Sequence, residues 1–286
     1  MKVDELAIEP YSRHFVTTDW NERLPLHPTT VGFSGHQHPI ARERGFADYH
    51  WLHTVEGAGE FTVLGRTFRL GPRQGVLLKP DVPHRYRPLT PRWSTWYLTF
   101  DGALAGAITA SLELQHMEPI GWDEDCPLSA LHEEYAEKCR SSFDFAGLSG
   151  SLAVFGFLTM LKQHGQTSGQ ASLTREHERL SPVYRLIEER YGDPGLGLPQ
   201  MADAVGVSPQ RLHALFRKSW GISPYQYLLR FRIQKAKELL LDDRGRAVKD
   251  IAADVGFQDF SHFVGTFRRV SGMTPTVFRR HYGDER

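Results

Sequence analysis

The chain has few of the features that mark secreted or membrane-spanning proteins. Only two cysteines occur in 286 residues, Cys126 and Cys139, and their spacing fits neither a zinc site nor a redox pair. No apolar run approaches the ~20 residues that cross a bilayer. The segment Met1–Pro10 lacks the basic-then-apolar layout of a secretory signal. These absences predict a cytoplasmic protein with reduced thiols and no membrane contact.

The sequence also lacks an overall excess of charge of either sign, because 34 Lys and Arg balance 34 Asp and Glu. The two signs are nevertheless unevenly distributed. Residues 181–286 carry 17 basic against 12 acidic side chains, a net charge of +5, and the remainder carries 17 against 22, or −5. A basic segment on an acidic body is typical of a DNA-binding module joined to another domain.

Turn residues and apolar spacing divide the chain into zones. Residues 1–102 are rich in Gly, Pro, aromatic residues and short alternating stretches such as 59–65 and 67–70, which predict the strands of a β-barrel or sandwich. In residues 103–164 apolar side chains recur at helical spacing, which predicts helices. One such set is Leu128, Leu131 and Tyr135, and a second is Leu152, Phe155, Leu158 and Leu161.

A linker is predicted at residues 165–180, because the run QHGQTSGQAS is polar, rich in Gly and Ser, and without apolar periodicity. Behind it, Ser181 and Pro182 fit the cap and first turn of a helix that ends before Gly192. From 181 to 286 the pattern stays helical. The predicted fold class is therefore a multidomain α+β protein whose last domain is all-α.

The C-terminal zone repeats itself with a period of about 50 residues. The paired segments are 201–207 with 251–257, 212–218 with 263–269, and 221–224 with 272–275. Each copy begins with a short Ala-rich helix that can pack closely. A repeat of this kind predicts one structural unit used twice.

Each copy has the local chemistry of a helix-turn-helix unit. Gly206 and Gly256 supply the positive φ that a tight turn between helices requires. Ser208 and Asp259 then fit as N-caps of the following helix. Ala-rich helix pairs with a glycine turn also occur in proteins that bind no DNA. Two copies, each closed by a pair of basic residues, favour DNA binding.

The exposed face of each second helix supplies the candidate DNA contacts. The residues predicted to reach base edges are Gln210, Arg211, His213 and Ala214 in the first copy, and Ser261, His262 and Gly265 in the second. The residues predicted to bind phosphate are Ser208, Arg217, Lys218, Arg230, Arg268 and Arg269. A helix over 225–241 would separate the two units as a strut.

Residues 181–282 closely resemble the DNA-binding domain of the AraC/XylS family, above all in the run from Ile251-Ala252 through Val255-Gly256-Phe257 to Pro275. The resemblance implies two helix-turn-helix units that contact successive major-groove segments. Gly265 departs from the family pattern, in which a larger base-contacting residue is frequent. The second unit is therefore expected to bind mainly phosphate, and the first to contribute more base readout.

The N-terminal zone resembles the cupin-like, sugar-sensing barrel of the same family. A strand over 75–78 runs through a Pro-containing turn to His84, and Gly57-x-Gly59 and an aromatic strand over 93–100 complete the pattern. The resemblance implies a ligand site in this barrel. Its expected residues are His38, Arg42, His84, Tyr86, Trp93, Thr95 and Tyr97. Each of them could instead belong to the barrel core or rim.

Cupins are frequently metalloenzymes, so a metal site is the main alternative for this zone. His36, His38 and His84 are candidate ligands, and His50 and His53 could share a strand. The compact motif of two histidines followed closely by a glutamate is absent, however, because Glu43 stands five positions beyond His38. We therefore expect no metal, no other cofactor and no enzyme activity.

Together these patterns predict a transcription regulator. Its expected partners are double-stranded DNA, a small-molecule effector of the sugar class, RNA polymerase for an activator, and a second copy of the chain that pairs through residues 103–164. Two alternatives stay open at this point. One is a constitutive dimeric regulator without a ligand, and the other is a metal-dependent cupin enzyme.

Overall fold

The computed structural model describes residues 9–167, 171–243 and 245–283. The chain divides into two compact parts, and the boundary falls between Thr174 and Arg175. We call them the N-terminal domain and the C-terminal domain.

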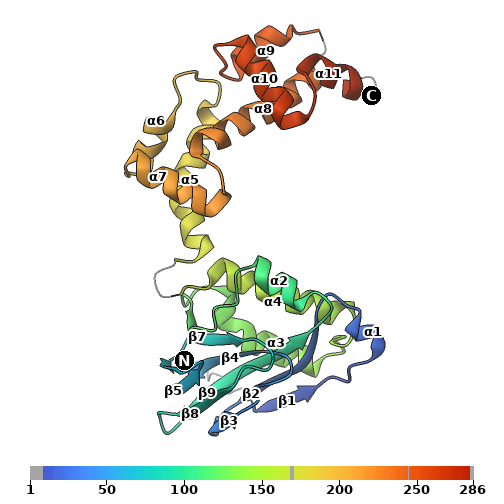
Figure 1. The fold of residues 1–286 in the computed structure, drawn as a ribbon, viewed down its shortest axis with the longest axis vertical. Helices are drawn as coiled ribbons and strands as arrows, with labels where there is room; N and C mark the ends of the chain where they lie inside the picture. Colours follow the sequence, from blue (N-terminus) through green and yellow to red (C-terminus); the bar gives the residue numbers. More distant parts are fainter. Residues whose placement is uncertain (1–8, 168–170, 244, 284–286) are drawn as a thin grey trace, which may run out of the picture. The chain divides into compact units, whose positions relative to one another are not determined.

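The N-terminal domain contains two antiparallel sheets (Figure 1). The six-stranded sheet has the order β1 (Tyr11–His14), β2 (His27–Ser34), β9 (Ser94–Asp101), β4 (Tyr49–Glu56), β7 (Gln74–Leu78) and β10 (Ile120–Gly121). The four-stranded sheet has the order β3 (Ile40–Arg42), β8 (His84–Pro88), β5 (Gly59–Val63) and β6 (Arg66–Leu70). The β-rich first zone predicted from the sequence is confirmed.

Alternation along β4 explains how the six-stranded sheet serves two cores. Trp51 joins the core shared with the helices, whereas its neighbour Leu52 joins the core between the two sheets. Successive side chains of a strand point to opposite faces, so one strand contributes to both layers. His50, two residues before Leu52, lies on the same face of β4, and its ring faces that of His84 on the opposite sheet. The interior of the two-sheet body is therefore lined by residues of both sheets, such as Leu52 of β4, Phe61 of β5 and Tyr86 of β8.

Helices cover the outer face of the six-stranded sheet (Figure 1). They are α1 (Asp19–Glu22), α2 (Ala105–Ser111), the 3-10 helix η1 (Pro127–Ala130), α3 (Leu131–Arg140) and α4 (Leu148–His164). Leu128, Leu131 and Tyr135 are buried, as their spacing predicts. Within the described residues, no helix combines the length and apolar character needed to cross a membrane.

The second predicted apolar set is only half correct. Leu158 and Leu161 are buried in α4, but Leu152 is 71% exposed and Phe155 is 45% exposed. Four residues at a strict spacing of three turn about 60° backwards at each step of a 3.6-residue helix, so they cannot share one face. The buried stripe instead combines Leu158 and Leu161 with residues such as Val154.

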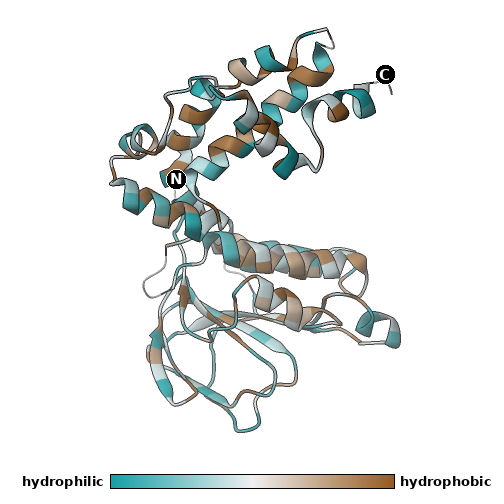
Figure 2. Ribbon diagram, turned by 45° about the horizontal axis from the view of Figure 1, so that its top comes forward, coloured by the Kyte–Doolittle hydropathy of each residue, from teal (hydrophilic) through white to brown (hydrophobic). Residues whose placement is uncertain are grey.

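Seven helices are described in the C-terminal part of the chain. They are α5 (Leu173–Arg190), α6 (Leu198–Asp203), α7 (Pro209–Trp220), α8 (Pro224–Asp242), α9 (Val248–Asp254), α10 (Phe260–Ser271) and α11 (Pro275–Gly283). Apolar and polar positions alternate around these helices (Figure 2). Two separate cores result, one around α5, α6 and α7 and the other around α9 and α10, and α8 contributes to both.

The predicted start of the first C-terminal helix is wrong. Helix α5 begins at Leu173, so residues 173–180 of the predicted linker are helical, and Pro182 lies inside the helix. The buried stripe runs from Glu176 through Leu180 to Val183, and its first member is polar. An apolar pattern alone could not detect that turn of helix. The predicted end before Gly192 is confirmed.

Candidate nucleic-acid interface and ligand site

The first helix-turn-helix unit consists of α6, a turn at Gly206 and α7. Gly206 has a φ of +63°, in the left-handed region that favours glycine. Ser208 caps α7, and its hydroxyl accepts a hydrogen bond from the backbone N–H of Arg211 at 3.2 Å. Leu212 and Phe216 are fully buried and fix α7 to the core. His213 and Ala214, which lie between them, are left on the outer face.

The second unit repeats this geometry with α9, Gly256 and α10. Gly256 has a φ of +87°, and Asp259 caps α10 by accepting from the backbone N–H of His262 at 2.7 Å. Phe263 and Phe267 are fully buried, as Leu212 and Phe216 are in the first unit. The internal repeat predicted from the sequence is therefore a structural repeat.

The predicted DNA contacts lie on exposed surfaces of these helices. Exposed residues of the first unit are Ser208, Gln210, Arg211, His213, Ala214, Arg217 and Lys218. Exposed residues of the second unit are Ser261, His262, Gly265, Arg268 and Arg269. Arg230 of α8 is exposed as well. A Cβ built on Gly265 would meet no atom within 4 Å, so this face of α10 is open.

Two of the basic residues on α7 have partners within the chain. Lys218 Nζ forms an ion pair with the carboxylate of Glu176 on α5. Arg217 Nη1 donates to the carbonyl oxygen of Gly221 at 3.0 Å. Both interactions would have to open or be shared if these side chains bind phosphate. The ion pair could not be predicted from a local sequence pattern, because Glu176 lies 42 positions before Lys218.

Helix α8 holds the two units together through a buried arginine. Arg232 is 3% exposed and donates from Nε to the carbonyl of Tyr191 at 2.8 Å and from Nη2 to that of Asp193 at 2.7 Å. Tyr191 packs against both C-terminal cores. The strut predicted between the two units is therefore anchored to the end of α5.

A cluster around Arg42 joins the two sheets of the N-terminal domain. Arg42 Nη1 lies 3.3 Å from His50 Nδ1 and 3.3 Å from His84 Nε2. The guanidinium also lies over the ring of Phe46, 4.9 Å from its centroid. His84 Nδ1 donates to the carbonyl of Val82 at 2.8 Å, which leaves Nε2 as the acceptor for Arg42.

Burial determines the protonation of this cluster. It lowers the pKa of His50 well below its usual value, and the nearby charge of Arg42 acts in the same direction. Burial also lowers the pKa of His84. The pKa of Tyr86 is raised by burial, although Arg42 opposes this shift. At neutral pH, Arg42 is the charged member of the cluster.

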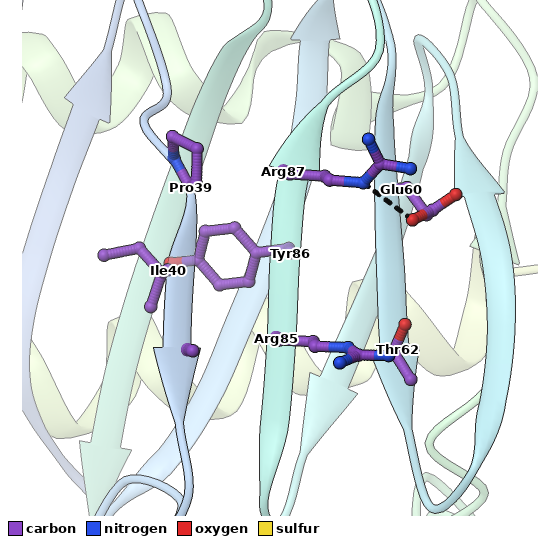
Figure 3. A pocket seen from close by; sticks show the side chains of 8 residues that line it. Pro39, Ile40, Glu60, Thr62, Arg85, Tyr86 and Arg87 are labelled. Atoms are coloured by element: carbon purple, nitrogen blue, oxygen red, sulfur yellow. Dashed lines mark hydrogen bonds and ion pairs between the residues drawn. The ribbon is translucent and has the colours of Figure 1, made fainter.

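Two hollows open on the four-stranded sheet beside this cluster. One, of about 400 Å³, is lined by Ala41, Arg42, Glu43, Thr62, Val63, Leu64, Gly65, Pro83, His84 and Arg85. The other, of about 510 Å³, is lined by Pro39, Ile40, Ala41, Glu60, Thr62, Arg85, Tyr86 and Arg87 (Figure 3). Both volumes lie in the range of small-molecule sites. In the second hollow Glu60 accepts from Arg87 Nε at 2.9 Å.

The structure brings only part of the predicted ligand set together. Arg42, His84 and Tyr86 line the two hollows. Trp93 packs edge-on against Tyr86, but it is buried and its indole N–H donates to Thr54 at 2.9 Å. Its polar atom is therefore already bonded within the barrel.

The remaining members of the predicted ligand set lie elsewhere. Thr95 is buried and donates to Gln37 Oε1 at 2.7 Å. Tyr97 donates from its hydroxyl to Ser12 at 2.8 Å. His38 is exposed. His50 belongs to the Arg42 cluster but not to the predicted ligand set, although the alternation of β4 could have placed it inside the barrel.

The metal alternative finds little support in this cluster. Across residues 9–167, 171–243 and 245–283, no three or more His, Cys, Asp or Glu side chains are grouped so as to hold an ion. The two histidines of this cluster, His50 and His84, have the guanidinium of Arg42 between them. A fixed cation at that place would repel a metal ion.

Known protein families match both the N-terminal and the C-terminal domain. Residues 26–142 match an AraC-like ligand binding domain. Residues 201–281 match a helix-turn-helix domain, and they span both units of the repeat.

Individual relatives match part of the chain. The chain is 31% identical over 124 residues to the HTH-type transcriptional activator RhaS of Escherichia coli, which covers 43% of this chain and 44% of RhaS. It is 34% identical over 106 residues to the uncharacterized transcriptional regulatory protein YesN of Bacillus subtilis, covering 36% of this chain and 29% of YesN. The chain thus spans less than half the length of these curated relatives.

Among solved structures, the C-terminal domain of the two-component response regulator yesN from Fusobacterium nucleatum is similar. It is 34% identical, with a TM-score of 0.32, and the match covers 34% of this chain and 93% of that one.

Proposed function

This chain belongs to the AraC family of transcription regulators, and we propose that it binds specific DNA sequences under the control of a small molecule. The observation that carries the proposal is the pair of capped recognition helices, α7 and α10, each with an exposed polar face. A ligand-binding domain precedes them in the same chain. The domains and relatives indicate regulation of transcription in place of enzyme activity.

The two helix-turn-helix units would enter successive major-groove segments. In α7, Gln210, Arg211 and His213 supply side chains that can bond base edges. In α10, Gly265 leaves an open position, and Arg268 and Arg269 supply charge for phosphate. The first unit would therefore carry more of the sequence discrimination, and the second would mainly add affinity.

The ligand would be a sugar that binds in the N-terminal domain. Support comes from the hollows beside Arg42, His84 and Tyr86, which combine hydrogen-bonding groups with an aromatic surface. A ligand that binds one arrangement of the domains better than another shifts the population of DNA-competent molecules. In an activator, those molecules would also contact RNA polymerase. The site of action would be the cytoplasm.

A second copy of the chain would pair through α4. Leu148, Leu152 and Phe155 recur along α4 and are 64%, 71% and 45% exposed. Side chains at such spacing form one apolar stripe on a helix. Two linked DNA-binding domains bind a double site more tightly by effective concentration. Sedimentation of the full chain and of Leu152→Glu tests this pairing, and an unchanged mass would argue against it.

Selection of duplexes from a random library tests the DNA-binding proposal. We expect enriched sequences that bind at least about 10³-fold more tightly than a shuffled duplex at the same salt concentration. Failure to enrich any sequence would contradict the proposal. Repeating the titration with a panel of sugars tests ligand control separately, because a constitutive regulator would bind the same duplex with unchanged affinity.

A further inference from the structure

The charge around Arg42 indicates which class of ligand this domain accepts. The guanidinium lies between two imidazole nitrogens, each 3.3 Å from Nη1, and over the ring of Phe46. In the part of the chain that the structure describes, no ion pair joins Arg42 to a carboxylate. A permanent cation is therefore held in place by uncharged groups.

The two histidines orient this cation without compensating its charge. His84 Nδ1 is committed to the carbonyl of Val82, so the lone pair of Nε2 points at Arg42. His50 is 3% exposed and presents Nδ1 in the same way. Both rings are neutral acceptors, because burial disfavours their charged forms. A partly buried charge without a counterion is costly, and a ligand anion would remove that cost.

The neighbouring hollow gives a ligand access to this charge. Arg42, His84 and Arg85 all line the hollow of about 400 Å³, in which Glu43 is the acidic member of the lining. Glu60 belongs to the adjoining hollow and is bound to Arg87. The basic side chains that line the first hollow thus outnumber the acidic one.

We propose that the effector is a small carboxylate of the sugar-acid class, whose carboxylate group pairs with Arg42. This inference rests on the proposed ligand control. A carboxylate matches the planar fork of a guanidinium and supplies one negative charge for one positive charge. A neutral sugar would leave the charge of Arg42 uncompensated, and a phosphate dianion would exceed it.

Thermal unfolding of the full chain with matched compounds tests the proposal. The probes are glucuronate, galacturonate, gluconate and galactonate, with glucose, galactose and their 6-phosphates for comparison. At about 10 mM, a ligand with a Kd of about 0.1 mM stabilises the folded chain measurably. We expect at least one acid to raise the unfolding temperature, and its neutral parent to have no effect.

Substitutions of Arg42 show whether this side chain binds the ligand or only supports the fold. Arg42→Met should abolish the shift, and Arg42→Lys, which keeps the charge but loses the fork, should weaken binding at least about ten-fold in calorimetry. Arg69→Met, at an exposed position of β6, is the matched control and should keep the shift. Arg42→Lys serves alone if Arg42→Met does not fold.

Three outcomes would overturn the proposal. They are stabilisation by neutral sugars as strong as by acids, stabilisation by the phosphates alone, and no stabilisation by any acid. Neutral sugars that stabilise would leave ligand control intact. If no compound of any class stabilises the chain while the selected duplex still binds, both the proposed ligand control and the proposed carboxylate effector are contradicted. The proposed DNA recognition is unaffected by that result.

Discussion

The carboxylate of Glu176 on α5 forms an ion pair with Lys218 at the carboxyl end of the recognition helix α7. Glu176 is 8% exposed, and within the described structure its Oε2 has no hydrogen-bond partner. The side chain of Lys218 is 45% exposed. Lys218, which is predicted to bind phosphate, is therefore held by an acidic residue of α5.

Glu176→Gln should release Lys218 for DNA. Removal of this carboxylate frees one cation next to the recognition helix, and each added phosphate contact steepens the salt dependence of binding. We expect tighter DNA binding and a slope of log K against log salt that is more negative by about 0.9. Fluorescence anisotropy at several salt concentrations measures both.

The matched control for this prediction is Glu178→Gln, which removes the same charge from an exposed position of α5. A long-range charge effect would change the affinity alike in both variants. An identical salt slope in Glu176→Gln and the wild type would show that Lys218 makes no phosphate contact after its release.

Gly256→Ala should destabilise the C-terminal domain more than Gly206→Ala. Both glycines have a positive φ, which costs an alanine roughly 1–2 kcal/mol. A Cβ on Gly206 would meet nothing within 4 Å, whereas one on Gly256 would lie 2.6 Å from the carbonyl of Tyr191 and 2.8 Å from Arg232. Overpacking adds about 1–3 kcal/mol at Gly256 alone.

Chemical denaturation of the full chain, with hydrogen exchange in α9 and α10, measures the difference between these two variants. Equal losses would mean that the turn at Gly256 can shift away from Tyr191 without cost.

Acid should destabilise the N-terminal domain through His53. Burial lowers the pKa of His53 to about 3, and Trp51 Nε1 donates to its Nδ1 at 3.0 Å. The unfolded chain binds a proton near pH 6.5 and the folded chain does not, so stability falls as the pH drops from about 6.5 towards 3. The maximum slope is about 1.4 kcal/mol per pH unit for one proton.

His53→Gln tests this pH dependence, because glutamine keeps an acceptor for Trp51 and does not titrate. Denaturation at pH 7 and pH 5 should show a smaller loss of stability in the variant than in the wild type. Parallel curves would assign the acid sensitivity to other groups, such as His50, whose pKa is also lowered by burial.

Substitutions in the two recognition helices should have different effects on DNA. Gln210→Ala should cost about 1–3 kcal/mol on a selected duplex and little on a shuffled one, because it removes a base contact. Arg268→Ala should weaken both complexes by a similar factor, because phosphate contacts carry no sequence information. Competition titrations compare the two. Equal discrimination by both variants would contradict the unequal roles of α7 and α10.

The parts of the fold that depend on local sequence could be predicted. Gly206, Ser208 and Leu212 define turn, cap and anchor within seven residues, and the second copy repeats them. Local patterns failed where a buried position is polar, as at Glu176, or where equal spacing does not match the helical repeat, as at Leu152 and Phe155.

The ligand cluster could be predicted only in part, because its members come from distant strands. Arg42, His50 and His84 meet across the two sheets, and their sequence separations of 8 and 42 residues carry no periodic signal. The family pattern included Arg42 and His84 but not His50. It also included Trp93, whose indole N–H is bonded within the barrel.

A hydroxyl-radical footprint of the full chain on a selected duplex tests most directly that both helix-turn-helix units recognise DNA. Two protected segments should appear on one face, about 10–10.5 base pairs apart, and Gln210→Ala should weaken protection of one of them. Uniform protection, a single protected segment, or equal protection of a shuffled duplex would contradict recognition by two units.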